Sequence, residues 1–584
     1  MTAGSATNGS LICRRCSFQN RPGDNYCERC GEPAIPPPSL PGEGPTNLED
    51  GTTRYLCAAA QRDPVFGDSA IAEYLVERVR AIPPSPGVDS TAVLREAVAA
   101  RARRRLRDAI LLVLLAAFVL VNPALLIGWL LVALPVKATF GSRGSGRPQL
   151  VSIAVAVGAL LLTVVVLSNL GGSVDGVLAA ATENPERTVP LALLIFGVLV
   201  ADEITVHHLV TERFRRSTFV ADHRSVPSNW ERIVRGLGHG AFQSALGRVA
   251  TAAYESTAQN DNQADVIVHR GASPFVGAGR TQEPEIIALP LEPAEDASEE
   301  PTPISVVDLH QHVAETLAAL RSASSLTPGK RLEGLRDREQ VLVPADRLAT
   351  NHRTLPGVLI DLDLPPAQHL PLTIARELAE RPLEWARYYR CYRIETWDRD
   401  LTTSCYFYAG TDQRMLYLEW THCVLPPIKE HYRAIDGVTK IGAGPLSASV
   451  GALLLLPTTI LRRLRSVTRR FVPLKQRVGE VLPERYGAGR SLRELAADDK
   501  AQTYFQGVDE IRYVKIVDTA LFRAVGHYLE QRGYDVVEFQ KIAKATITNN
   551  NVSVSGGTFI GSTMGAGTVT GGGTTQTGPA KGSE

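Results

Sequence analysis

Three long apolar runs dominate the first half of the chain. Residues 109–136 and 150–170 are almost entirely aliphatic, and the pattern returns at residues 189–201 and continues to about residue 210. Crossing the hydrocarbon core of a bilayer takes a helix of roughly 20 apolar residues. The pattern therefore predicts an α-helical membrane region, with transmembrane helices at 150–170 and 189–210.

The first apolar run is interrupted by Asn122-Pro123. Proline lacks the amide donor that a helix interior needs, and it disfavours helical geometry in the residue before it. Residues 109–136 are therefore expected to form either one kinked span or a hairpin of two half-length helices.

The charges that flank the apolar runs favour the hairpin, because cytoplasmic flanks of membrane proteins are rich in Arg and Lys. Five arginines at 101–107 precede the first run, the loop at 137–149 is basic, and the loop at 171–188 is mainly acidic. A hairpin places every basic flank on one side. We thus expect a multi-pass protein of the cell membrane with the N-terminus and the C-terminal region in the cytoplasm, whereas a single kinked span would export the C-terminal region.

The second half of the chain has the pattern of a soluble α+β region. Short strand-like segments at 264–269 and 285–291 predict an α/β segment over 218–292. Helical periodicity at 307–323 and aromatic, β-branched stretches between Tyr388 and Val424 predict an α+β domain over 304–440 with an antiparallel β meander. The predicted fold class is multi-domain, with a small N-terminal module, a helical membrane region and this cytosolic region.

Three further segments follow the predicted α+β domain. Residues 441–471 are apolar and then basic, which fits either a membrane-surface segment or a buried loop and helix. Residues 490–545 are expected to be helical. The Gly/Thr/Ser-rich tail at 546–584 fits either a disordered tail or a strand-forming segment that promotes assembly.

The charge composition limits the classes of partner that this chain is expected to bind. The chain has 62 basic and 61 acidic residues, a net charge of +1. A general nucleic-acid binder carries a basic excess, so no nucleic-acid partner is expected. The predicted partners are the lipid bilayer and either a protein partner or further copies of this chain, and the pattern identifies no small molecule.

Four of the eight cysteines lie near the N-terminus as two CxxC pairs, Cys13 with Cys16 and Cys27 with Cys30. Two such pairs can supply four thiolates in a tetrahedron, the geometry that zinc prefers. The stretch from residue 11 to residue 34 resembles the short prokaryotic zinc ribbon. That resemblance implies a structural Zn²⁺ with no open coordination position. A Pro/Gly-rich linker at 35–67 and a helical, basic segment at 68–107 are expected to follow.

A second group of polar residues directly follows the last apolar run. Asp202, Glu203, His207 and His208 lie there, and Glu203 and His207 share a helix face at i, i+4 spacing. Ionisable groups at membrane depth can form a proton relay or a metal site. The alternative is that the helix simply leaves the bilayer at Asp202.

No complete catalytic motif occurs in the sequence. We therefore expect a membrane-anchored sensor or protein-interaction scaffold. One alternative is an enzyme with a site in residues 304–440 that uses His352, Asp361 or Asp363. The other is a small transporter or channel that uses Asp202, Glu203 and His207.

Overall fold

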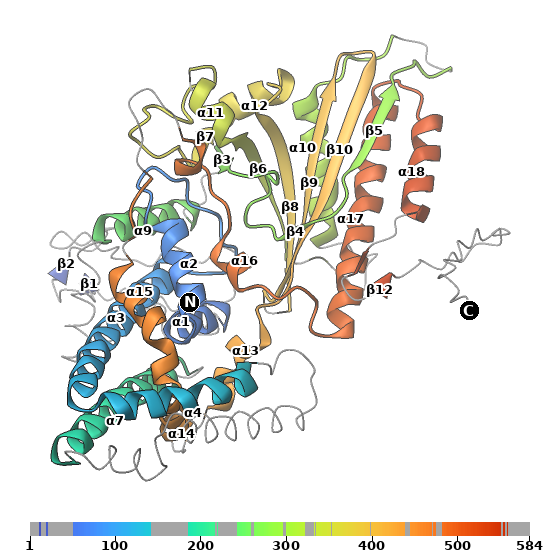
Figure 1. The fold of residues 1–584 in the computed structure, drawn as a ribbon. Helices are drawn as coiled ribbons and strands as arrows, with labels where there is room; N and C mark the ends of the chain where they lie inside the picture. The colour runs from blue at the N-terminus through green and yellow to red at the C-terminus, as the bar shows by residue number, and fades with distance from the viewer. Residues whose placement is uncertain are drawn as a thin grey trace, which may run out of the picture.

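A computed structural model describes part of the chain (Figure 1). The described residues are 11–12, 19–20, 51–141, 185–215, 219, 242–257, 262–295, 300–321, 332, 334–351, 353–397, 399–438, 444–469, 471–474, 482–549, 553–554 and 557–558. Within them, an N-terminal helical region leads to an α+β region built on a mixed sheet.

The helical region has its own hydrophobic core. The core is formed by α1 (Gly51–Arg62), α2 (Pro64–Tyr74), the first half of α3 (Ser90–Val121) and α9 (Gln243–Thr257), with short α13 (Glu430–Arg433) and α16 (Leu492–Ala496) from the C-terminal half. Asp63 and Asp89 begin α2 and α3, because their carboxylates accept hydrogen bonds from the free amides of the first turn.

A second, apolar group of helices lies beyond this core (Figure 1). It consists of the second half of α3, α4 (Pro123–Gly141), α7 (Pro185–His208) with a π-helical turn (Leu209–Arg213), α14 (Gly444–Leu454) and α15 (Ile460–Thr468). Leu111, Leu115 and Phe118 of α3 pack there against Ile195 and Leu199 of α7. A single helix, α3, therefore belongs to both cores.

The chain breaks its helix at Asn122. The side chain of Asn122 accepts a hydrogen bond from the amide of Leu125, which caps the start of α4, and the ring of Phe118 packs edge-on against Trp129. In Figure 1, α4 runs across the end of α3 instead of continuing it. Proline at the first position of α4 explains the break, because its missing amide is not needed there.

The α+β region is organised around an eight-stranded sheet in the order β4-β10-β9-β8-β6-β3-β7, with β5 also paired to β10. The β3–β6 pair is parallel and the other pairs are antiparallel. The strands are β3 (Gln263–His269), β4 (Arg280–Thr281), β5 (Glu285–Pro290), β6 (Leu335–Pro344), β7 (His369–Pro371), β8 (Arg387–Thr396), β9 (Leu401–Thr411) and β10 (Met415–Leu425).

Helices α10 (Val306–Ala318), α12 (Leu372–Glu380) and α17 (Tyr504–Gln531) pack against this sheet, and α18 (Val537–Asn549) packs on α17. Short α11 (Ala345–Asn351) follows β6. Thr503 begins α17 through a capping box with Gln506. Two small strand pairs, Leu11–Ile12 with Gln19–Asn20 and Ser553–Val554 with Gly557–Thr558, lie near the ends of the chain.

A half-buried carboxylate connects the helical region to the sheet. Glu494 of α16 accepts hydrogen bonds from the backbone amides of Gly277, Gly279 and Ser491 at 2.7–3.0 Å. Gly277 and Gly279 belong to the loop between β3 and β4. This contact fixes the loop against α16 and explains why it is a structural turn.

The structure differs from the predicted boundaries at two places. The expected linker at 35–67 gives way to helix at Gly51, because Leu56, Cys57 and the alanines of α1 are buried against α3. The segment 218–292 and the domain 304–440 are not separate, since β3 pairs with β6 and β5 pairs with β10 in one sheet. Pairing across a long sequence separation leaves no local signal.

The multi-pass expectation is also corrected for the residues described. Among them, one helix, Pro185–Arg213, is long and apolar enough to cross a membrane, and α14 with Leu456–Thr468 would add a second only as a span bent by 74°. This is weak evidence for membrane association. The predicted helix at 150–170 lies outside the described residues, and α3 is half polar, so its apolar part is short for a span.

Candidate functional site

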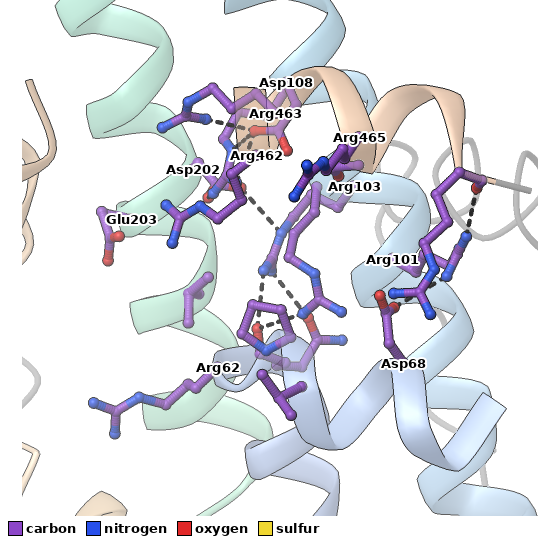
Figure 2. A pocket seen from close by; sticks show the side chains of 18 residues that line it. Arg62, Asp68, Arg101, Arg103, Asp108, Asp202, Glu203, Arg462, Arg463 and Arg465 are labelled. Carbon is purple, nitrogen blue, oxygen red and sulfur yellow. Dashed lines mark hydrogen bonds and ion pairs between the residues drawn. The ribbon is translucent and has the colours of Figure 1, made fainter. Parts of the chain in front are cut away.

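Helices α3, α7 and α15 meet around a cavity of about 680 Å³, at the level where α3 changes from polar to apolar (Figure 2). Charged side chains dominate its lining. They comprise nine arginines, Arg62, Arg101, Arg103, Arg104, Arg107, Arg462, Arg463, Arg465 and Arg469, and four carboxylates, Asp68, Asp108, Asp202 and Glu203. The cavity therefore carries a large excess of positive charge.

Asp202 of α7 is held by two arginines of α3. Its carboxylate lies 3.0 Å from Arg103 Nε and 2.6 Å from Arg107 Nη1. Only the second contact has hydrogen-bond geometry. Asp202 and Arg103 are both buried, and a buried carboxylate needs such partners because its desolvation is costly.

Asp108 of α3 joins the third helix to this network. Its carboxylate accepts from Arg107 at 2.9 Å and from Arg463 Nη1 at 2.5 Å. Arg463 belongs to α15, which is 355 residues further along the chain. The three helices are thus connected by alternating charges, as the dashed lines in Figure 2 show for the labelled residues.

Arg103 and the next arginine of α3, Arg104, also face the end of α1. Arg103 donates to the carbonyl of Gln61, and Arg104 Nη1 donates to the carbonyls of Ala60 and Gln61 at 3.1 and 3.4 Å. The last carbonyls of a helix have no partner within it and carry partial negative charge. Gly67 of α2 leaves room beside them, since a Cβ there would lie 3.2 Å from Arg104 Nη2.

Burial perturbs the arginines of α3 that lie before its apolar half. Burial, followed by the neighbouring charge of Arg103, lowers the pKa of Arg104 to about 10. Burial likewise lowers the pKa of Arg101 and Arg103 below the usual range. Each guanidinium remains charged at neutral pH.

The structure separates the four polar residues predicted after the last apolar run. Asp202 is engaged by arginines. Glu203 lines the large cavity and also a neighbouring cavity of about 360 Å³, where His207 joins it. His208 is exposed and lines neither cavity. No group of three or more ligating side chains that suits a metal ion occurs in the described part of the chain.

The residues suggested for an enzyme site do not come together in the described structure. Asp361 and Asp363 are exposed, and the Asp361 carboxylate accepts the amide of Asp363 within a loop. His352 lies outside the described residues. Their spacing along the chain supplied no geometric reason to group these residues, and the structure supplies none for the two aspartates.

A buried His–Asp pair lies between the sheet and α17. His422 Nε2 is 2.6 Å from Asp518 Oδ1, and Cys405 is directly opposite His422 on the neighbouring strand. Burial raises the pKa of the Cys405 thiol well above its usual value, so it is not an activated nucleophile. Cys423 contacts Thr281 on the other side of the sheet, as the alternation of strand side chains predicts.

Comparison with known families finds one match to this chain. Residues 285–563 match the AbeC-like domain family. The matched part begins at β5 and includes β6–β10, α10, α15 and α17, whereas α1–α4, α7 and α9 lie outside it. No curated protein and no solved structure matches the chain. The cavity is therefore lined by α15 from the matched part and by α1, α2, α3 and α7 from outside it.

The resemblance of residues 11–34 to a zinc ribbon is corrected by these findings. The family comparison identifies an AbeC-like domain and no zinc ribbon, and no metal-binding group is found in the described ranges. The resemblance relied on cysteine spacing in a short stretch, which carries little fold information. Cys13, Cys16, Cys27 and Cys30 themselves lie outside the described residues, so their binding of a structural Zn²⁺ is not tested.

Sequence reasoning did not identify most of this cavity. It used the arginines at 101–107 as indicators of orientation, and it assigned those after residue 461 to a segment that lies either on the membrane surface or in a buried helix. It did not single out Asp108. The sequence feature that could have indicated the cavity is a charged residue at the boundary of an apolar helical segment. Nothing local indicated that α15 would lie beside α3.

Proposed function

We propose that this protein is a membrane-anchored sensor or scaffold. The apolar helices hold it at the bilayer, and the AbeC-like α+β region works on the cytoplasmic side by binding a protein partner or further copies of this chain. The observation that carries the proposal is α3, one helix that begins in the core of the helical region and ends among the apolar helices.

The surface of the apolar helices supports the bilayer as their environment. Large apolar side chains that are exposed recur along α3, α4, α7, α14 and α15. They are Ile110, Val113, Leu120, Val132, Leu134, Val189, Leu193, Leu194, Ile204, Leu446, Val450, Leu454, Leu461 and Leu464. Soluble monomers rarely expose so many together.

The arginines support the cytoplasmic orientation. Those at 101–107 and those at 462–469 approach each other at one end of the apolar helices, since Arg101 donates to the carbonyl of Arg469 and Arg105 to that of Ser466. The α1–α2 helices lie at the same end. Basic flanks favour the cytoplasmic side, so the α+β region would be cytoplasmic as well.

The edge of the sheet at β5 supports the proposed binding of a protein partner. β5 pairs with β10 on one side only within the described residues, and Ile286 on it is 68% exposed. Unpaired strand edges are templates for an added strand. The transporter alternative has less support, because both carboxylate oxygens of Asp202 face arginines.

Two measurements on the full chain test this proposal. We expect the protein to stay in the membrane fraction after an alkaline wash. Protease should digest the α+β region in inverted vesicles and spare it in right-side-out vesicles. Release by the wash, or digestion in right-side-out vesicles, would contradict the anchoring or the orientation. Absence of both a copurifying partner and self-association would contradict the scaffold.

A further inference from the structure

The arginine-lined cavity has the chemistry of an anion site. We propose that it binds a phosphate group, supplied by the headgroup of an anionic phospholipid. The assignment to a lipid rests on the proposed membrane anchoring, whereas phosphate binding itself does not.

The first argument is the charge left over after the internal ion pairs. Asp202 and Asp108 are neutralised by Arg103, Arg107 and Arg463, and Asp68 is paired with Arg101 at 3.1 Å. The remaining arginines have no carboxylate within ion-pair distance in the described structure. They are Arg62, Arg104, Arg462, Arg465 and Arg469. Glu203 alone cannot balance them.

The second argument is an orphaned buried donor. Arg104 is 7% exposed, and its Nη1 already donates to the last carbonyls of α1. Its Nη2 is buried and has no hydrogen-bond partner among the described residues, and Arg104 is one of the residues that line the cavity. A buried donor is normally satisfied, and a guanidinium matches the oxygens of a phosphate especially well.

The third argument is location. The cavity lies where α3 changes from the charged residues Arg107 and Asp108 to the apolar residues that follow. At the same level, α7 changes from apolar to polar residues at Asp202. The exposed arginines Arg462 and Arg465 form part of its lining. If the apolar helices lie in a bilayer, this level coincides with the headgroups, where clustered arginines attract anionic lipids. A volume of about 680 Å³ accommodates a headgroup.

The test uses the purified full chain in neutral detergent. Native mass spectrometry would compare retention of phosphatidylglycerol with that of phosphatidylcholine. In parallel, the midpoint of thermal unfolding would be measured with inorganic phosphate and with chloride at equal ionic strength. We expect selective retention of phosphatidylglycerol, and at least about a tenfold loss of affinity for it in Arg104→Gln, as one lost charge-assisted hydrogen bond implies.

Two double variants complete the design. Arg462→Gln with Arg465→Gln removes exposed lining charges, so it tests the proposal even if Arg104→Gln fails to fold. Arg347→Gln with Arg353→Gln makes the same charge change on exposed residues of the α+β region, and we expect it to bind phosphatidylglycerol like the unaltered protein.

Each outcome decides the proposal. Stabilisation by phosphate without a preference for phosphatidylglycerol would support a phosphate site but overturn the lipid as its source. No preference and no stabilisation, or equal loss in the control double variant, would overturn the site. Retention in membranes after an alkaline wash is independent of these results, so failure of the site can be distinguished from failure of the anchoring.

Discussion

At the scale of single residues, Gly279 is subject to two separate constraints. Its φ is +89°, and a Cβ there would lie 2.4 Å from the carbonyl oxygen of Val424. Gly271 has nearly the same φ, +87°, but no atom within 4 Å of a Cβ. The pair therefore separates the cost of backbone conformation from the cost of steric contact.

We expect Gly271→Ala to lower the free energy of unfolding by roughly 1 kcal/mol, the cost of a left-handed conformation. Gly279→Ala adds overpacking and should cost about 3 kcal/mol or more. Chemical denaturation of the two variants measures the difference. Equal losses would mean that the loop moves away from Val424 without cost.

His310 provides a pH-dependent prediction. It packs edge-on against Tyr388 and Phe407 on the buried side of α10, and burial lowers its pKa to about 3. The unfolded chain binds a proton at this residue near pH 6.5, whereas the folded chain does not. Stability contributed by neutral His310 is thus complete above pH 6.5 and is lost as the pH falls towards 3.

His310→Phe removes this linkage while it keeps an aromatic ring in place. Between pH 6.5 and 4, the stability of the variant should fall less steeply than that of the unaltered protein, by up to about 1.4 kcal/mol per pH unit. Denaturation at a series of pH values checks this slope. His431→Phe changes an exposed histidine, and it should leave the slope of stability against pH unchanged. If His310→Phe has the same slope as the unaltered protein, His310 is not the source of the pH dependence.

At the scale of elements, the packing of α3 against α7 depends on buried ion pairs. Asp202→Asn removes the carboxylate that pairs with Arg103. It also removes one of the two carboxylates that pair with Arg107. Breaking a buried pair from one side costs roughly 3–5 kcal/mol. We therefore expect strong destabilisation and faster proteolysis of α7.

Glu203→Gln is the matched control for Asp202→Asn. Glu203 is the next residue of the same helix, it is half-buried, and no ion pair within 4 Å is found for it among the described residues. The change should cost less than about 1 kcal/mol, as for weakly coupled charges. A loss equal to that of Asp202→Asn would show that general charge, and not the pairing, stabilises the contact.

At the scale of the whole molecule, the proposed membrane anchoring depends on the apolar face of α7. Leu193 and Leu194 are exposed apolar residues in the middle of this helix. Replacing both with Asp should raise the free energy of insertion by about 3 kcal/mol or more per residue. We expect most of the protein to leave the membrane fraction or to be degraded.

Ile286→Asp with Ile360→Asp is the control for this prediction, since both residues are exposed apolar positions of the α+β region. The control protein should remain in the membrane fraction after an alkaline wash. If the α7 variant behaves like the control, the bilayer is not the environment of α7.

Much of the secondary structure was determined by the sequence itself. Alternating and aromatic patterns located β3, β5 and the β8–β10 meander, and 3.6-residue periodicity located α10. Asn122-Pro123 marked the end of α3. These features are local, because backbone geometry and one-sided burial impose their period on neighbouring residues.

Only the tertiary structure decided which distant segments meet. The sequence contained the arginines of α3 and those of α15, but not the contact between Asp108 and Arg463, which are 355 residues apart. Nor did it reveal that β3 and β6 are parallel neighbours in one sheet. Such contacts depend on which faces pack together, and arginine serves equally well as a solvated flank, an ion-pair partner or a helix cap. The apolar helices were therefore predictable from sequence, whereas the cavity at their polar end was not.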